Sequence, residues 1–496
     1  MAIERTADVV VVGAGYAGLT AATLLADAGV DVVLVEARDR VGGRVHTRHH
    51  EIAGRTVTID HGGQWVGPTQ RRIRALARRV GARLHPSWVE GLHSEWWSGQ
   101  QHTYTGPIAN GEPEVAAEAV AAALELDLMA LDVDPAAPWA CDDAAEWDAM
   151  TVESWLQQQD FDHPNTVEAM RLIVRTVLTQ EAGDVSLLHL LFYIRSAGGT
   201  LQLYGQDGTA QDARFVGGAQ TVADGLAAEL GDRVLLGAPV RRIEHSAQGV
   251  VVHADGDLVV RARRAVVTLP PTLAGRLVYA PALPGRRDQL TQRVPMGTVI
   301  KCHAVYDTPF WRQAGRSGIG VAGDGVVRLC FDASPADGSA GVLLAFITAG
   351  EARRSSQGTP AARQREVLAF FARFFGPRAA EPQAYLETAW SEEEFSRGCY
   401  AGSLGPGGWT GYGEELRAPV GPLHWAGTET AVVWSGYIDG AVESGERAAR
   451  EVLDALGVPA ERHPERLPAS GGALGTDDDR AEVAALSAPL TTAREG

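Results

Sequence analysis

The sequence predicts an α/β fold, with α+β character overall, in which a Rossmann-type domain is interrupted by an inserted domain of mixed sheet and helices. Two observations predict it. A strand, a glycine-rich turn, a helix and a second strand follow one another within residues 8–36. The chain also has 496 residues, which is too long for one hydrophobic core, and strand and helix patterns recur far downstream of that first unit.

The first unit has the order and spacing of a dinucleotide-binding motif. An aspartate and four valines form the first strand, and the second apolar strand ends at Glu36. Between the strands, Gly13 permits a tight turn, Gly15 lets the backbone approach a pyrophosphate, and Gly18 lets the helix pack on the strand. Glu36 stands where a carboxylate can accept hydrogen bonds from both hydroxyls of a ribose. These features together predict a dinucleotide site.

Two further pairs of glycines follow this motif. In the first, an arginine after the pair can bring a second set of donors to the same diphosphate, which favours FAD over NAD. The second pair lets the backbone approach a flat ring, although an ordinary tight turn explains it equally well. The residues assigned to the cofactor on this basis are Arg38, Gly42, Gly43, Arg44, Gly62, Gly63, Gln64 and Trp65.

The bulk composition is that of an ordinary soluble globular protein, with 45% hydrophobic and 21% charged residues. A formal net charge of -18 disfavours a nucleic-acid partner and an anionic membrane surface. No run reaches the roughly 18 apolar residues that a membrane span needs, and the N-terminal residues lack the pattern of a secretory signal. We therefore expect a cytoplasmic protein without membrane attachment.

The cysteines and histidines give no metal signal. The four cysteines are unevenly spaced and contain no CxxC pair, so neither a zinc site nor a disulfide framework is predicted. His46, His49 and His50 lie close together, but no carboxylate or cysteine stands at a ligand spacing from them. A polar turn is the better interpretation, and no metal is expected.

One basic residue is exceptional. Of the 44 basic residues only one is a lysine, Lys301, and the others are arginine. Lys301 lies in the apolar run 299–305, which is typical of a buried strand rather than of a solvated surface. A compact ammonium differs chemically from a guanidinium, so a lysine retained in this background indicates a special role.

The order of the patterns predicts two discontinuous domains and a tail. Residues 1–85, 215–290 and 390–455 are assigned to the nucleotide-binding domain. Residues 86–214, expected to be mostly helical, and residues 291–389, with alternating strands and helices, are assigned to the inserted domain. The last stretch, 456–496, is rich in proline, glycine and alanine and is expected to be disordered.

The segment 390–450 combines glycines, aromatic residues and a lone thiol at an unusual density. Cys399 and Tyr400 follow a glycine, and Tyr437 precedes a helix of small residues. A core strand or a solvated loop would not need this composition. We expect the segment to close over a flat aromatic cofactor.

The motifs together resemble the flavin amine oxidase family, in the branch of the monoamine oxidases. The run 36–44, the pair Gly62-Gly63 and the Gly398-Cys399-Tyr400 triplet carry the resemblance, which extends from residue 8 to about 455. It implies FAD as the cofactor, held as an 8α-S-cysteinyl thioether through Cys399. Unlike the mammalian monoamine oxidases, this sequence offers no C-terminal membrane helix.

The resemblance also implies roles for residues that the local pattern does not identify. Lys301 matches the lysine held near the flavin N5 through a water molecule, and Tyr400 and Tyr437 match the two tyrosines that flank the substrate nitrogen. Further cofactor contacts are implied for Val240, Trp390, Gly427, Thr428, Glu429, Trp434 and Ile438. The implied lining of the substrate cavity consists of Tyr204, Gln211 and Leu329.

The function implied is the FAD-dependent oxidation of an aryl-alkyl or alkyl primary amine to an aldehyde, with release of ammonia and hydrogen peroxide. A diamine or polyamine oxidase would need a carboxylate at the far end of the cavity, and the implied lining supplies none. An L-amino-acid oxidase would need a cavity arginine, for which Arg175 and Arg195 are candidates of unknown direction. A non-catalytic flavoprotein is the remaining alternative. The expected partners are the amine and oxygen, with a homodimer left open.

Overall fold

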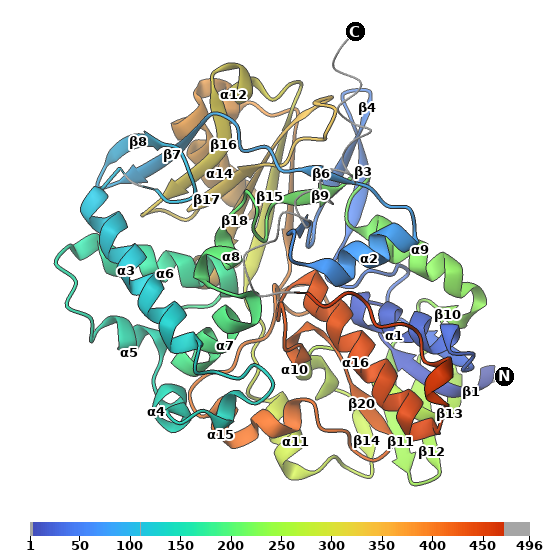
Figure 1. The fold of residues 1–496 in the computed structure, drawn as a ribbon. Coiled ribbons are helices and arrows are strands. Elements are labelled where there is room, and N and C mark those ends of the chain that lie inside the picture. Colours follow the sequence, from blue (N-terminus) through green and yellow to red (C-terminus); the bar gives the residue numbers. More distant parts are fainter. Residues whose placement is uncertain (1–2, 110, 471–496) are drawn as a thin grey trace.

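The computed structural model describes residues 3–109 and 111–470, which form two large sheets with helices packed around them (Figure 1). The first sheet has the strand order β10-β2-β1-β13-β12-β11-β14, with β20 paired to β13. Strands β1, β2, β10, β13 and β20 run parallel, as expected of a Rossmann-type domain. Their bounds are β1 Ile3–Val12, β2 Val32–Val35, β10 Val234–Leu235, β11 Val240–Ser246, β12 Gly249–Ala254, β13 Leu258–Val267, β14 Val278–Ala280 and β20 Leu423–Trp425.

Helices close one face of this first sheet. Helix α1 packs against α16, and α9 lies beside α1, so that small and branched apolar side chains of the three helices and of β1 and β2 form one core. The continuous valines of β1 are fully buried because helices and loops cover both faces of a parallel sheet. The bounds are α1 Tyr16–Asp27, α2 Arg71–Arg79, α9 Gln220–Leu230, α10 Pro271–Ala274, α11 Gly285–Thr291 and α16 Ile438–Leu456.

The second sheet has the order β19-β15-β18-β17-β16-β7-β8 and is largely antiparallel. Strand β15 lies between the edge strand β19 and β18, and it is buried along its whole length. The tryptophan-rich stretch before residue 105 forms the hairpin β7–β8 at the edge of this sheet. The bounds are β7 Leu92–Trp97, β8 Gln100–Tyr104, β15 Val299–Tyr306, β16 Arg316–Ala322, β17 Leu329–Asp332, β18 Gly341–Thr348 and β19 Ala384–Ala389.

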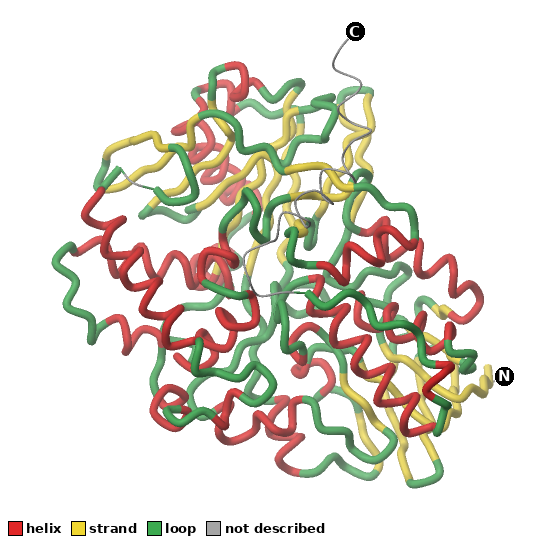
Figure 2. The backbone as a smooth tube through the Cα atoms, in the orientation of Figure 1, coloured by secondary structure: helices red, strands yellow, loops and turns green. Residues whose placement is uncertain are grey.

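The inserted helices lie on one side of the molecule, away from α1 and α16, as the helix colouring of Figure 2 makes clear. Their apolar faces meet in a separate core centred on α7, which is buried on almost every residue. The bounds are α3 Pro113–Ala130, α4 Ala144–Ala149, α5 Val152–Leu156, α6 Pro164–Leu178, α7 Leu187–Ala197, α8 Thr200–Tyr204 and α15 Gly408–Tyr412. Helices α12 Phe310–Gln313, α13 Ala349–Ser355 and α14 Pro360–Phe375 accompany the second sheet.

Two small sheets join these parts. The ribbon of β3 and β4 is anchored to the second sheet through Arg55, whose guanidinium donates to the carbonyl of Tyr306 at 2.8 Å. Strands β5, β9 and β6 form the other small sheet. The bounds are β3 Thr47–Ile52, β4 Arg55–Asp60, β5 Trp65–Val66, β6 Leu84–Pro86 and β9 Ala213–Phe215.

The predicted fold class is confirmed, but the predicted tail is partly wrong. Residues 457–470 follow α16 and pack on the first domain. Arg462 donates to the carbonyl of Ala28 at 2.6 Å, and the backbone N–H of Leu467 donates to Glu446 at 3.0 Å. The rest of the predicted tail, 471–496, lies outside the described residues. Within the described part of the chain, no helix is both long and apolar enough to cross a membrane.

Candidate active site

A cavity of about 900 Å³ is lined by residues of both large sheets and of the helices beside the second sheet. One end is lined by the glycine turn after β1, by Glu36 at the end of β2 and by Val240 at the start of β11. The middle passes Cys399 and Lys301, and the other end reaches α6, α8 and the β7–β8 hairpin. An elongated channel that joins a nucleotide-type end to an apolar end suits a dinucleotide with a flat ring at its far side.

Two helix N-termini open onto this cavity without a side-chain cap. Helix α1 begins after Gly15 and α16 begins after Tyr437, and neither N-cap residue makes a side-chain hydrogen bond to the helix. Uncapped N–H groups and the helix dipole favour an anion such as a diphosphate. Gly13 has a φ of +100°, and a Cβ on Gly18 would lie 1.9 Å from the Gly13 carbonyl oxygen. The donors and the lack of side chains at the turn therefore fit the diphosphate of FAD.

Glu36 is held rigidly at this end of the cavity. Its carboxylate accepts the backbone N–H of Ala14 at 2.7 Å and that of Arg38 at 2.9 Å, and the residue is only 4% exposed. The two bonds fix the carboxylate across the end of β2, beside the cavity wall. The arrangement fits recognition of a ribose.

A buried ion pair supports the segment that carries the thiol. Arg44 donates to both carboxylate oxygens of Glu429, at 2.5 and 3.0 Å, and to the carbonyl of Tyr400 at 2.8 Å. Glu429 also accepts the backbone N–H of Gly402 at 3.2 Å. The pair links the Gly42-Gly43 turn to the segment 399–402. Glu429 lies behind the cavity wall and does not line the cavity.

Cys399 lines the middle of the cavity and is 5% exposed. Burial raises the pKa of its thiol to about 12, while the positive charges of Arg44 and Lys301 oppose that rise. Its backbone N–H donates to the carbonyl of Gly297 at 3.0 Å, and the peptide bond to Tyr400 is cis. The thiol is thus fixed beside two cations at the boundary between the two halves of the cavity.

Three tyrosines lie together beyond the thiol. Tyr400 and Tyr437 both line the cavity, as does Tyr193 from α7, whose ring centroid is 6.0 Å from that of Tyr437. The hydroxyl of Tyr437 donates to the carbonyl of Leu203 at 2.8 Å, and Trp434 packs edge-on against the Tyr437 ring. Burial raises the pKa of Tyr400 and of Tyr437, so both phenols stay neutral. Electron-rich aromatic faces in this position can align an amine.

Lys301 reaches the same cavity from β15. Its Nζ donates to the carbonyls of Asp60 and Gly62 at 2.6 and 2.7 Å and to Oε1 of Gln64 at 2.6 Å. Burial lowers the pKa of Lys301 to about 7, the charge of Asp60 opposes this, and the charge of Arg214 adds to it. The three oxygen acceptors stabilise the ammonium form against this effect of burial. With a pKa of about 7, the group changes its charge near neutral pH.

The far end of the cavity is apolar with a few polar exceptions. Tyr204, Gln211 and Leu329 line it, as the family resemblance implies. Glu95 on β7 also lines it, is 1% exposed, and accepts the backbone N–H of Gly111. Sequence reasoning missed Tyr193, Glu95 and Phe346, which other elements bring to the cavity through long-range packing. Phe346 stands opposite Lys301 in the β15–β18 register, and no local pattern marks it.

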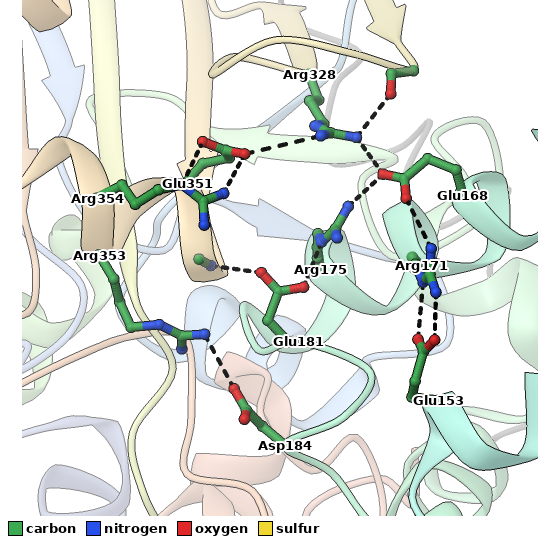
Figure 3. Close-up of polar contacts among 12 residues, drawn as sticks. Glu153, Glu168, Arg171, Arg175, Glu181, Asp184, Arg328, Glu351, Arg353 and Arg354 are labelled. Atoms are coloured by element: carbon green, nitrogen blue, oxygen red, sulfur yellow. Dashed lines mark hydrogen bonds and ion pairs between the residues drawn. The ribbon is translucent and has the colours of Figure 1, made fainter.

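The two arginines considered for a substrate carboxylate do not line the cavity. Arg175 donates to Glu168 at 2.5 Å and to Glu181 at 2.7 Å, within a network of ion pairs on α6 and its neighbours (Figure 3). Arg195 is exposed near the end of α7. Among the described residues, the arginines that line the cavity are Arg38, Arg44, Arg241, Arg276 and Arg397, which come from the nucleotide-binding domain as predicted from the sequence.

Most residues predicted for the site lie along this cavity, and three do not. Gly18, Glu429 and Trp434 stand behind its wall, where Gly18 packs on the glycine turn and Trp434 supports Tyr437. The remaining predicted cofactor residues, Gly42, Gly43, Gly62, Gly63, Gln64, Trp65, Trp390, Gly427, Thr428 and Ile438, all line it. No group of three histidine, cysteine or acidic residues in the described ranges could hold a metal ion.

The chain is similar to known proteins over most of its length. The family model for flavin-containing amine oxidoreductases matches residues 16–453. The chain is 39% identical over 451 residues to the "Probable flavin-containing monoamine oxidase A" of Dictyostelium discoideum, with 90% of this chain and 98% of that protein covered. It is 37% identical over 459 residues to "Amine oxidase [flavin-containing] B" of Sus scrofa, with 91% and 86% covered.

Solved structures give the same result for the fold. A putrescine oxidase bound to putrescine superposes with a TM-score of 0.87 at 36% identity, over 91% of this chain and all of that one. The cyclohexylamine oxidase from Brevibacterium oxydans gives a TM-score of 0.86 at 34% identity with the same coverage.

Proposed function

The chain belongs to the flavin-containing amine oxidoreductases, and from this membership we propose that it oxidises a primary amine to an aldehyde, with FAD as cofactor and oxygen as electron acceptor. The convergence of Lys301, Cys399, Tyr400 and Tyr437 on one cavity carries the proposal. Lys301 comes from β15 in the second sheet, whereas the other three come from the later segment 399–437. A packing role alone would not need a thiol, a sole lysine and two tyrosines along one channel.

FAD supplies the redox chemistry by accepting a hydride equivalent from the carbon beside the amine nitrogen and passing the electrons to oxygen. The tyrosines do the positioning. Tyr400 and Tyr437 present neutral rings on the wall of the cavity, and the apolar surroundings disfavour an ammonium ion. The amine is therefore held as the neutral base, whose lone pair assists the transfer. The imine product hydrolyses to the aldehyde and ammonia.

Cys399 would hold the flavin ring covalently through its 8α carbon. Cys399 would supply the sulfur of this thioether; the thiol and the methyl group would each give up one hydrogen, and oxygen would take the two electrons. The position of Sγ on the cavity wall supports this role. Burial raises the pKa of the thiol to about 12, so the group is protonated at rest, and the charges of Arg44 and Lys301 only oppose that rise. The linkage would fix the ring between Lys301 and the tyrosines.

Lys301 would provide positive charge on the cavity wall. All three hydrogens of its ammonium group are donated to protein oxygens, so Nζ is held in place and its charge, not a free donor, would act on the reacting oxygen. A cation in a buried site stabilises negative charge that develops on oxygen much more strongly than it would in water.

The substrate end favours an amine without a carboxylate. An amino acid would need a cation near its carboxylate, and the arginines that line the described cavity belong to the predicted nucleotide-binding domain. Arg175 is engaged by Glu168 and Glu181 instead. An aryl-alkyl or alkyl amine fits the leucine, isoleucine and phenylalanine side chains that line this end, such as Leu172, Ile173 and Phe331.

A diamine is a second candidate, and Glu95 is the observation that favours it. This carboxylate is 1% exposed and lines the far end of the cavity, where it could receive a second ammonium group. The similarity to putrescine oxidase adds support. The candidate lining Tyr204, Gln211 and Leu329 lacked a carboxylate, and Glu95 supplies one from a strand not considered for that lining.

A peroxide assay separates these candidates. We expect peroxide from benzylamine, tyramine or phenylethylamine, and little from amino acids. A preference for putrescine that falls in Glu95→Gln, with aryl-alkyl amines unaffected, would assign the diamine function. Absence of peroxide with every amine, in protein that holds FAD, would refute the proposed oxidase activity.

A further inference from the structure

Four histidines gather near Lys301, whose charge acts on two of them. The histidine cluster consists of His46, His50, His61 and His303. The ring centroid of His61 lies 5.7 Å from that of His46, 5.1 Å from that of His50 and 5.8 Å from that of His303. Three separate elements supply them, since His50 is on β3, His61 follows β4 and His303 is on β15. The cluster has no part in the proposed amine chemistry and needs its own explanation.

A hydrogen-bonded chain runs through this cluster. Nδ1 of His61 is 2.7 Å from the hydroxyl oxygen of Thr388, and Nε2 of His61 is 2.9 Å from Nε2 of His50. His50 is partly exposed on β3, whereas His61 is buried. Both ring nitrogens of His61 are thus engaged, one toward the protein interior and one toward the surface. An imidazole in this position can take a proton at one nitrogen and release it from the other.

The inner end of the chain lies beside Lys301. Thr388 on β19 stands opposite Lys301 in the antiparallel register with β15, where directly opposed side chains are close neighbours. The two carbonyls that accept from Nζ of Lys301 belong to Asp60 and Gly62, which flank His61 in the chain. His303 is two residues beyond Lys301 on the same face of β15, and its ring centroid is 5.8 Å from that of His61, so the lysine, the threonine and the two imidazoles are neighbours.

His303 is an unusual residue for a buried position. It is 1% exposed, and neither of its ring nitrogens has a hydrogen-bond partner among the described residues. A buried polar group without partners is costly, and such groups in native proteins call for an explanation. An apolar residue would fill the space without that cost. A second imidazole beside His61 and Lys301 is consistent with a place where a proton or a water molecule passes.

The charges around the cluster favour passage of a proton over its storage. Burial lowers the pKa of His61 to about 3 and that of His303 well below its ordinary value, and burial lowers the pKa of His46 to about 4. The neighbouring cations lower these values further. The imidazoles are therefore neutral at rest. The titratable and charged groups that act on the cluster are Arg38, Asp39, Arg40, Arg48, His49, Arg214 and Lys301.

The proposed reaction has a proton requirement at this place. Reduction of oxygen to hydrogen peroxide takes two electrons and two protons, and a hydride equivalent supplies two electrons and one proton. The second proton is equivalent to the one that the substrate ammonium loses when it binds as the neutral amine, and it must reach the reduced oxygen once in each turnover. The imine leaves the tyrosine side as its protonated form, takes up water and ends as aldehyde and ammonium, so it does not return that proton.

We propose that His61, together with Thr388 and His50, relays this proton from solvent to the site of Lys301. The inference rests on the proposed oxidase function and extends it to residues that the family resemblance did not indicate. The proton enters at the exposed side of His50, crosses the bond between the two Nε2 atoms and leaves His61 through Nδ1. Thr388 accepts this proton at Oγ1 and releases its own hydroxyl proton to a water molecule beside Nζ, and His61 then returns to its starting tautomer.

The test uses flavin-loaded enzyme and a matched control on the same ribbon. His61→Gln keeps a polar side chain but cannot relay through two ring nitrogens. His49→Gln is the control, since His49 is exposed on β3 and bonds Thr58 at 3.0 Å, outside the chain. The bound flavin is reduced with light and EDTA in the absence of oxygen, and its reoxidation by oxygen is followed by absorbance. This reduction needs no amine, so the result does not depend on the choice of substrate.

We expect His61→Gln to reoxidise at least about tenfold more slowly than the parent, somewhat below the factor of about 10²–10⁴ of a direct acid–base group. The solvent isotope effect should increase, the control should match the parent, and added imidazole should restore part of the rate in His61→Ala. A parent-like rate in His61→Gln overturns the relay. So does a slowing that the control shares, or one without an increased solvent isotope effect.

A second readout does not use turnover. In ¹⁵N-histidine spectra of the flavin-loaded enzyme, we expect His50 and His61 to show one hydrogen shared between their Nε2 atoms and to respond together when either is replaced. Independent spectra for the two residues would overturn the chain. Normal spectra and relay behaviour combined with no oxidation of any amine would instead refute the proposed oxidase function alone.

Discussion

Replacement of Lys301 by methionine tests the electrostatics of the site through folding stability. In the native protein the pKa of Lys301 is lowered from 10.5 to about 7 by burial. Between these two values the unfolded chain binds a proton at this position and the native chain does not. Stability therefore rises with pH in this window, and the cost of burying the ammonium is fully present below pH 7.

The size of this change in stability follows from the same two pKa values of Lys301. One unit of pH changes the free energy of unfolding by at most about 1.4 kcal/mol for one proton. At pH 7 the native lysine is half protonated, so the gain between pH 7 and pH 9 is about 2 kcal/mol. Lys301→Met has no titrating group at this position and gains no stability in this way. Between pH 7 and pH 9, the free energy of unfolding of the parent should therefore rise by about 2 kcal/mol relative to that of the variant.

Urea unfolding of flavin-loaded parent and variant at pH 7, 8 and 9, followed by tryptophan fluorescence, measures this difference. Contributions from titrating groups that Lys301 does not influence are shared and cancel. The variant also loses the hydrogen bonds that Nζ donates, three from the ammonium form and two from the amine form. A difference that stays constant from pH 7 to 9 would refute the reasoning, because it would show that the three oxygen acceptors keep the ammonium charged throughout.

Three further changes give contrasting results. Acid precipitation of the parent should leave yellow flavin in the pellet, whereas Cys399→Ala should release it to the supernatant; a colourless parent pellet contradicts the thioether. Glu429→Gln breaks the buried pair with Arg44, whose side chains are 2% and 20% exposed, and should lower the free energy of unfolding by about 3–5 kcal/mol in urea titrations. Arg328→Gln removes a partner of Glu168, whose side chain is 26% exposed, and should lower the free energy of unfolding by only about 1 kcal/mol or less in the same titration. A loss as large as that of Glu429→Gln would contradict the idea that burial of the carboxylate decides the cost.

The parts predictable from the sequence are those determined locally or by composition. The turn of Gly13, Gly15 and Gly18 was predicted because each glycine acts on neighbours within a few residues. Lys301 was found because one lysine among 44 basic residues is conspicuous. The role of Cys399 could not be predicted from local pattern or from composition, because a buried free cysteine usually serves only as a small apolar residue. Its assignment to the flavin came from resemblance and stays a prediction.

The parts that were missed depend on contacts across the fold. Phe346 faces the cavity because it is opposite Lys301 in the register of two strands that are 35 residues or more apart in the chain. His61 and His303 become neighbours only when the β3–β4 ribbon meets the second sheet, although nearby histidines were considered as metal ligands. Disorder was wrongly predicted for 457–470 because composition does not reveal single anchoring bonds such as that of Arg462.

The positions of the lysine and the thiol are linked directly by backbone. The N–H of Cys399 donates to the carbonyl of Gly297, and the N–H of Gly297 donates to the carbonyl of Ala401, each at 3.0 Å. A Cβ on Gly297 would lie 2.6 Å from the carbonyl oxygen of Cys399, so the two segments approach as closely as backbone allows. Strand β15 begins two residues later and carries Lys301. A ring tethered at Cys399 would therefore have its distance from Lys301 determined by this backbone pairing, independently of movements in the inserted helices that receive the amine.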